Sequence, residues 1–399
     1  MKGRWLKRIS TGLGAVAIAG LVALYATTSG CTTFGALPEG ARQDRIAKNP
    51  HFIDGEFKNT EATTMMVGDS ASAMAEFAFG NGQMRTPKCV MPLATGAPEI
   101  WAQPPESGLR ITWLGHSTTV IELDGVRILT DPMFSDRASP STLAGPLRFH
   151  PPPVPLAQLP KIDAVLISHD HYDHMDMPTV IALAASGVKF YVGLGNGAHL
   201  ERWGIKLEQI VEVEWGNRFP LPGGVEIVST PARHFSGRGV FSRNRSLWTS
   251  WALVGPKHRV FFSGDTGLSE TFTATGQQYG PFDVSMLEIG QWHPNWGQIH
   301  LGPEGAITAH KALGAKRLFP IHWATFELGL HSWLEPAETL TTSAAKQGVA
   351  VVTPMLGEPV EPTLDRPSVA WWRNYPPMAS FCPKGEISSN RRPLADWPM

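Results

Sequence analysis

The chain has 399 residues, of which 42% are hydrophobic and 17% charged, and its formal net charge is -1. This length is enough for one large domain or two ordinary ones. The composition is that of a globular protein and excludes a disordered chain. Basic residues form no block beyond a few at the extreme N-terminus, which argues against nucleic-acid binding.

The N-terminus is predicted to be a targeting segment. Four basic side chains precede an apolar stretch, residues 12–26, that is too short for a comfortable bilayer span. Thr28-Ser29-Gly30-Cys31 then resembles a bacterial lipobox, with Thr28 in place of the usual leucine. We therefore expect residues 1–30 to be a signal peptide of the lipoprotein type, and the protein to be exported to the periplasm or outer membrane and lipid-anchored at Cys31. An ordinary signal peptide and an uncleaved anchor are the alternatives.

Residues 31–108 show Gly and Pro interruptions and little periodicity, so we expect an N-terminal arm that packs on the core. The two remaining cysteines, Cys89 and Cys382, do not make a disulfide framework, and whether they pair stays open. Residues 361–399 are again Pro-rich and are expected to form a C-terminal tail on the surface.

Regular structure is predicted from residue 109 onward. Asp124-Gly125 indicates a tight hairpin turn between two of the expected strands. Strands are expected at 111–113, 119–123, 126–130, 164–167, 190–192, 211–213, 225–228, 251–254, 260–262, 284–287, 318–321 and 349–352. Helices are expected at 178–185, 197–203, 303–313 and 336–347. This order favours two sheets with helices on the outside.

The pattern H-x-H-x-D-H at residues 169–174 follows the apolar run 164–167 directly. A strand that ends in such a cluster delivers several ligands to one point, and imidazole and carboxylate are ligands that zinc accepts. The alternative is a polar loop that happens to be rich in histidine. That alternative leaves the buried strand before the cluster unexplained.

Three more polar residues follow apolar strands. His234 follows the strand that starts at residue 225, Asp265 follows residues 260–262, and His322 follows residues 318–321. A lone histidine in such a loop is more often structural. Because loops at strand ends converge on one edge of a sheet, we expect these three to join the histidine cluster.

These residues carry a family resemblance. The chain resembles the metallo-β-lactamase superfamily and, within it, the N-acylphosphatidylethanolamine-hydrolysing phospholipase D group and its bacterial outer-membrane-protein relatives. The segments that carry it are Trp113-Leu114-Gly115-His116-Ser117-Thr118, Leu129-Thr130-Asp131-Pro132, residues 168–174, Phe261-Phe262-Ser263-Gly264-Asp265-Thr266 and Ile321-His322-Trp323-Ala324-Thr325-Phe326. The resemblance implies an α/β fold, a four-layer αβ/βα sandwich, over residues 109–360.

The resemblance also implies a two-zinc centre. His169, His171 and His234 would hold one zinc, while Asp173, His174 and His322 would hold the other. Asp265 would bridge both, and iron or manganese are alternative metals for such ligands. A hydroxide bridging the two metals would be the nucleophile, with Asp265 and Asp173 as the catalytic carboxylates.

Further residues take roles around this centre. Tyr172 and His300 match positions that contact phospholipid in the related phospholipase. Asp131, His116 and Glu288 are expected to orient ligand rings, with ordinary capping or core hydrogen bonds as the alternative. Three tryptophans would line an apolar entrance or simply pack in the core: Trp292, Trp296 and Trp323.

The expected function is hydrolysis of N-acylphosphatidylethanolamine to N-acylethanolamine and phosphatidic acid at a membrane surface. The substrate would be a phospholipid or another small phosphodiester. A lactonase or other phosphodiesterase of the same fold and a non-catalytic envelope lipoprotein are the alternatives. The sequence gives no indication of the oligomeric state.

Overall fold

The computed structural model describes residues 32–67, 84–239, 241–364 and 369–375. The expected signal peptide, Cys31 and Cys382 lie outside these residues. Cys89 is disulfide-bonded. Among the described residues, no helix has the length and apolar character needed to cross a bilayer.

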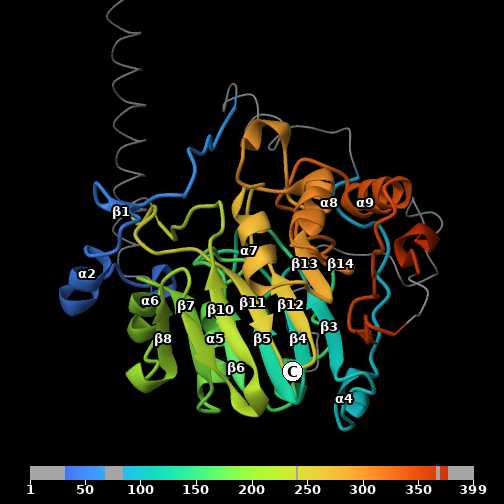
Figure 1. Ribbon diagram of the computed structural model, residues 1–399, viewed down its shortest axis with the longest axis horizontal. Coiled ribbons are helices and arrows are strands. Elements are labelled where there is room, and N and C mark those ends of the chain that lie inside the picture. The colour runs from blue at the N-terminus through green and yellow to red at the C-terminus, as the bar shows by residue number, and fades with distance from the viewer. Residues whose placement is uncertain (1–31, 68–83, 240, 365–368, 376–399) are drawn as a thin grey trace, which may run out of the picture.

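The first sheet contains seven strands and is antiparallel at one side and parallel at the other (Figure 1). Its strands lie in the order β15 (Pro359–Val360), β3 (Leu109–Gly115), β4 (Thr118–Leu123), β5 (Val126–Thr130), β6 (Ala164–Ile167), β7 (Lys189–Gly193) and β8 (Ile210–Val213). Because β3, β5 and β6 run in one direction, the loops after them emerge at the same edge.

The second sheet contains six strands. They lie in the order β14 (Arg317–Ile321), β13 (Val284–Glu288), β12 (Arg259–Phe262), β11 (Ser250–Val254), β10 (Glu226–Thr230) and β9 (Arg218–Pro220). Strands β12, β13 and β14 are parallel, and β10 runs in the same direction because β11 is antiparallel to both of its neighbours.

Successive side chains of the first sheet point alternately into two apolar layers, one on each face of the sheet. In β6, Ala164 and Leu166 belong to the core between the two sheets, whereas Val165 and Ile167 belong to a second core under helix α5 (Met177–Ala184). Successive side chains of a strand point to opposite faces, so a strand buried on both faces reads as a continuous apolar run.

Helices cover the outer faces of both sheets. α6 (Gly197–Arg202) contacts β8 of the first sheet, and α8 (Gly302–Ala312) packs on β13 of the second, between α7 (Thr271–Tyr279) and α9 (Glu335–Lys346). The order helix, sheet, sheet, helix confirms the αβ/βα sandwich expected from the sequence. The boundaries of α5, α6, α8 and α9 fall within one residue of the expected ones.

The arm runs along the core before the first sheet begins. It contains η1 (Thr32–Phe34), α2 (Gly40–Ile46), the hairpin of β1 (Phe52–Ile53) and β2 (Glu56–Phe57), and later α4 (Ala97–Ile100). Helix α2 is held by Arg42, which donates to Glu201 and Glu212 on the first-sheet side. In Figure 1 the first part of the arm, residues 32–67 in blue, extends from α2 and β1 toward the upper part of the molecule. The Val67 amide donates to the Asn295 carbonyl.

Two expectations differ from the structure. Residues 349–352 form an isolated bridge between Leu318 and Val351 instead of a strand. The C-terminal tail does not stay on the surface at residues 371–375, because Trp371 and Trp372 are buried in a tryptophan cluster whose other members are Trp113, Trp323 and Trp333. The large apolar area of the indole rings stabilises this packing.

Candidate metal centre

The predicted site residues meet at one edge of the sandwich, where strand after strand ends. Each predicted ligand lies in a loop that directly follows a buried strand: the 168–174 segment after β6, His234 after β10, Asp265 after β12 and His322 after β14. The parallel directions described above bring these strand ends together. All seven predicted ligands fall in two groups of neighbouring imidazole and carboxylate side chains, and a third group, made of Asp265, Glu288, His300 and His322, shares one residue with each of them.

The first group contains His169, His171, His234 and Asp265, whose ligand atoms all lie within 4.8 Å of one another. His169 Nε2 lies 2.8 Å from His171 Nδ1. Asp265 Oδ2 lies 3.8 Å from His169 Nε2 and 3.8 Å from His234 Nε2. These separations suit donors around a single small cation, since zinc–nitrogen and zinc–oxygen bonds are about 2.0–2.2 Å long.

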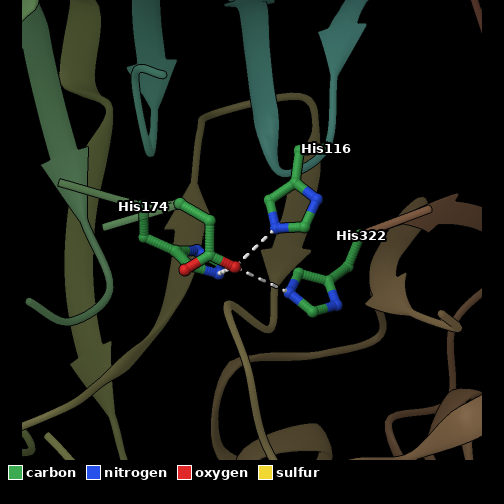
Figure 2. A group of neighbouring side chains, drawn as sticks. His116, His174 and His322 are labelled. Atoms are coloured by element: carbon green, nitrogen blue, oxygen red, sulfur yellow. Dashed lines mark hydrogen bonds and ion pairs between the residues drawn. The ribbon is translucent and has the colours of Figure 1, made fainter. Parts of the chain in front are cut away.

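The second group contains Asp173, His174 and His322, together with His116. Figure 2 shows His116, His174 and His322 turned toward one carboxylate. Asp173 Oδ2 lies 2.8, 3.4 and 3.6 Å from the Nε2 atoms of His116, His174 and His322, respectively. Asp265 also reaches this group, with Oδ2 3.2 Å from His174 Nε2 and Oδ1 3.1 Å from His322 Nε2. Asp265 thus lies between the two groups.

Hydrogen bonds to Nδ1 orient four of the histidine rings. Asp131 accepts from His174, Ser168 from His169, the Ile299 carbonyl from His234, and the Gly290 carbonyl from His322, at 2.7, 2.9, 2.9 and 3.2 Å. With Nδ1 engaged in this way, each Nε2 points into the shared space. A ligand histidine bound to a metal commonly shows the same arrangement.

Buried polar atoms without a partner support a cation site. His174 Nε2, His234 Nε2, His322 Nε2 and Asp265 Oδ1 are all buried and make no hydrogen bond within the described part of the chain. Leaving such groups unsatisfied costs about 1–3 kcal/mol each. A divalent cation at each group would satisfy all four atoms, so the residues present fit the metals that the ligand pattern implies.

Burial and neighbouring charges shift the pKa values of the side chains in the centre. Burial alone raises the pKa of Asp265, but His174 and His322 outweigh it and hold this pKa well below its usual range. Burial lowers the pKa of His322, but Asp265 and Asp173 raise it to about 10. Burial keeps the pKa of His169 well below its usual value, helped by the imidazole of His174. Asp265 is therefore anionic and His169 is neutral and able to bind a cation, whereas His322 must release its proton to bind one.

Backbone strain also concentrates here. His116, Asp131, His322 and Ala324 have φ angles of 51, 35, 66 and 55°. Non-glycine residues in this region cost about 1–3 kcal/mol each and persist where the surrounding structure fixes them. The His116 turn is fixed by Thr325 Oγ1, which accepts from the His116 amide at 2.7 Å. Burial lowers the pKa of His116 to about 3, so its neutral ring donates Nε2–H to Asp173.

The two predicted substrate contacts, His300 and Tyr172, have different neighbours. His300 donates Nδ1–H to Glu288 at 2.8 Å and stacks on His322, with ring centroids 5.6 Å apart. Burial lowers the pKa of His300, but Glu288 outweighs it and the pKa is raised. Tyr172 donates its hydroxyl to the Arg238 carbonyl, and its ring packs against the Arg238 guanidinium.

The three tryptophans expected either to line an apolar entrance or to pack in the core do not all lie in the same surroundings. Trp323 is buried and stacks on Trp113 with centroids 5.3 Å apart, so it is a core residue. Trp296 lies 5.9 Å from His300, beside the centre. Trp292 lies against Gly302 and stacks with His331.

Several contributing groups were missed by sequence reasoning. Ser168 links Asp131 to His169, and the carbonyls of Gly290 and Ile299 orient two more rings. Ser168 directly precedes the histidine cluster, which is a usable signal. A backbone carbonyl has no sequence signal, because every residue has one.

Buried imidazoles and carboxylates converging between two sheets, at the ends of their strands, define a metal-dependent hydrolase of the metallo-β-lactamase type. The chain belongs to this superfamily: residues 126–323 match the family described as "Beta-lactamase superfamily domain". An uncharacterized Mycobacterium tuberculosis protein is 45% identical over 333 residues, which are 82% of this chain and 88% of that protein.

Two further relatives are enzymes by name. The N-acyl-phosphatidylethanolamine-hydrolyzing phospholipase D 1 of Caenorhabditis elegans is 38% identical over 59% of this chain and 69% of its own length. A UPF0173 metal-dependent hydrolase of Pyrobaculum neutrophilum is 31% identical over 55% of this chain and 86% of its own length. Among solved structures, a possible metal-dependent hydrolase from Veillonella parvula has the same fold, with a TM-score of 0.51 at 15% identity over 63% of this chain and 98% of that one.

Proposed function

We propose that this hydrolase is a phospholipase D-type phosphodiesterase that cleaves N-acylphosphatidylethanolamine. Water adds to phosphorus, the bond from phosphorus to the ethanolamine oxygen breaks, and the products are N-acylethanolamine and phosphatidic acid. The observation that carries the proposal is the 38% identity over 247 residues to a phospholipase of that name. The two ligand groups around Asp265 support it, because two-metal sites suit in-line displacement at phosphorus.

We infer that two zinc ions occupy the centre. His169, His171 and His234 would hold one ion and Asp173, His174 and His322 the other, with Asp265 shared between them. Three imidazoles at the first position favour zinc over magnesium or calcium. Bound there, the ions would supply an activated water and would offset the negative charge that grows on the phosphoryl oxygens.

The protein's own groups do the positioning. Asp131, Ser168 and the Ile299 carbonyl hold ligand rings in fixed tautomers, so little reorganisation is needed during the reaction. His300 keeps Nδ1 on Glu288, which leaves Nε2 to donate to a phosphoryl oxygen. Tyr172 already uses its hydroxyl on Arg238, so we propose that its ring, and not its hydroxyl, contacts the lipid.

The test is a comparison of substrates on purified, metal-replete protein. We expect release of N-acylethanolamine from N-acylphosphatidylethanolamine, and about two zinc per chain by metal analysis. Asp265→Ala and His171→Ala should lose nearly all turnover while keeping the fold by circular dichroism. Asp44→Ala, at an exposed position of α2, is the control and should keep full activity.

Other results would redirect the proposal. Opening of lactones with no phosphodiester cleavage would assign a lactonase. Retention of both metals with no turnover on either substrate class would indicate a non-catalytic protein.

A further inference from the structure

The arm contributes contacts directly behind the metal centre, although it lies outside the matched domain. Residues 59–67 run past His234 and end beside the loop of residues 293–300, which carries His300. This loop reaches the centre twice, since the Ile299 carbonyl orients His234 and the adjacent His300 stacks on His322. Whatever fixes this loop therefore fixes both a ligand and a substrate contact.

Asn59 holds the peptide groups of His234. Its Nδ2 donates to the His234 carbonyl at 2.9 Å, and its Oδ1 accepts from the His234 amide at 3.0 Å. The same Oδ1 accepts from Trp248 Nε1, which fixes the orientation of the amide. Both sides of the His234 backbone are thus bound by one side chain that comes from 175 residues earlier in the chain.

Arg233, immediately before His234, joins the arm to the loop. Its buried guanidinium donates to the Ala62 carbonyl, to Thr63 Oγ1 at 3.0 Å and to Gln298 Oε1 at 2.8 Å. The N–H groups of a guanidinium point in fixed directions within one plane. The ammonium group of a lysine cannot reproduce this set of hydrogen bonds. A single side chain therefore ties the arm to the 293–300 loop.

The arm and the loop also pair through their backbones. The backbone N–H of Gln298 donates to the Thr64 carbonyl at 2.9 Å. The backbone N–H of Thr64 donates to the side-chain Oε1 of Gln298 at 3.1 Å. Gly297 has φ +58°, and a Cβ there would lie 2.0 Å from the Thr64 oxygen. Only glycine permits this approach, so the loop is shaped to fit against the arm.

From these contacts we propose that Asn59 and Arg233 are positioning residues, and that arm residues 59–64 form a wall of the site that sets the places of His234 and His300. The inference rests on the proposed function only for its kinetic consequence. Its structural consequence, a rigid 293–300 loop and a fixed His234, holds for any substrate.

The experiment compares Asn59→Ala, Asn59→Asp and Arg233→Lys with Lys58→Ala, a control at the partly exposed neighbour on the same arm, whose side chain pairs only with Glu56 among the ion pairs of the described residues. Asn59→Asp keeps the acceptor for the His234 amide but loses the donor to its carbonyl, so it tests the contact without removing the side chain. Hydrogen exchange of the His234 and Gln298 amides, and zinc affinity against a competing chelator, are measured on the full-length protein.

We expect at least about tenfold faster exchange at one or both amides and about tenfold weaker zinc binding in the Asn59 variants. Arg233→Lys should raise the KM for the lipid substrate by roughly tenfold while kcat changes less, because misplacing His300 weakens substrate contact. Exchange and zinc affinity equal to those of Lys58→Ala would overturn the proposal. Absence of lipid hydrolysis by the unmodified protein would instead remove the proposed function and leave the exchange and zinc results to decide this inference.

Discussion

Single contacts at Nδ1 decide which nitrogen four of the imidazoles present to the centre, those of His169, His174, His234 and His322. Asp131 illustrates this most clearly. Its Oδ2 accepts from His174 Nδ1 and from Ser168 Oγ, both at 2.7 Å, while Oδ1 accepts from the Ser168 amide. Ser168 Oγ in turn accepts from His169 Nδ1. The buried Asp131 carboxylate therefore orients His174 directly and His169 through Ser168, one ring in each ligand group. The sequence analysis expected it to orient only one ring.

Replacing Asp131 by asparagine should weaken metal binding. The amide side chain keeps one acceptor oxygen, but its NH2 group would face another donor at His174 Nδ1 or Ser168. Loss of such a contact behind a ligand typically costs 10–100-fold in metal affinity. Titration against a competing chelator measures the effect, and Asp163→Asn, where the carboxylate accepts from the Arg127 amide, is the control. Unchanged affinity in Asp131→Asn would show that the carboxylate is dispensable for ring orientation.

Among the helices and strands, the loops that follow the strands carry the predicted ligands, whereas the helices pack against the sheets and stabilise them. Helix α8 packs on β13 through His310, whose Nδ1 lies 2.8 Å from Ser285 Oγ. Burial lowers the pKa of His310 from 6.5 to about 4, with a further contribution from Lys311. The neutral ring thus belongs to the packing of the second sheet and not to the metal centre.

This buried ring makes stability fall in acid. Between pH 6.5 and about 4 the unfolded chain binds a proton at His310 that the folded chain does not, so the unfolding free energy decreases as pH falls through this window. One such group contributes a slope of about 1.4 kcal/mol per pH unit. In His310→Gln we expect the slope of unfolding free energy against pH to be smaller by up to this amount. Denaturant unfolding of chelator-treated protein from pH 4 to 7 gives the slope, and an identical slope in both proteins would contradict the assignment.

At the scale of the whole molecule, segments from both ends of the chain complete the domain. The matched family covers residues 126–323, whereas the arm binds the backbone of His234 and residues 371–375 enter the tryptophan cluster behind the centre. Trp323, the neighbour of His322, packs edge-on against Trp372 with centroids 5.4 Å apart. The core and the centre therefore depend on residues outside the common domain.

Trp372→Ala should destabilise the fold. The residue is only 1% exposed, and truncating a buried tryptophan to alanine costs about 3–5 kcal/mol. Val369→Ala, at a side chain that is 62% exposed, is the control and should change stability by less than about 0.5 kcal/mol. Chemical denaturation measures both. A loss below about 1 kcal/mol in Trp372→Ala would mean that the C-terminal segment is not part of the core.

Some of the structure could not be read from local patterns. Helix α7 was not predicted, because its sequence TFTATGQQY is rich in threonine and contains a glycine. The helix is stabilised by packing instead, since Phe272 enters the core and Gly276 lies where a Cβ would be 2.7 Å from the Ala312 carbonyl. Residues 349–352 show the reverse case, in which an apolar run found only one bridge partner.

The sequence alone indicated two sheets with outer helices and the seven ligand candidates, and the family resemblance implied the four-layer sandwich. A buried strand followed by a histidine or aspartate is a local pattern that places the side chain at a sheet edge. The position of Asp265 between the two groups was already expected from the family resemblance, whereas tertiary structure decided the ring orientations and the contribution of Asn59 and Arg233. These depend on contacts between residues far apart in the chain, many of them to backbone carbonyls. A carbonyl acquires such a role from its position in the fold and not from the residue that carries it.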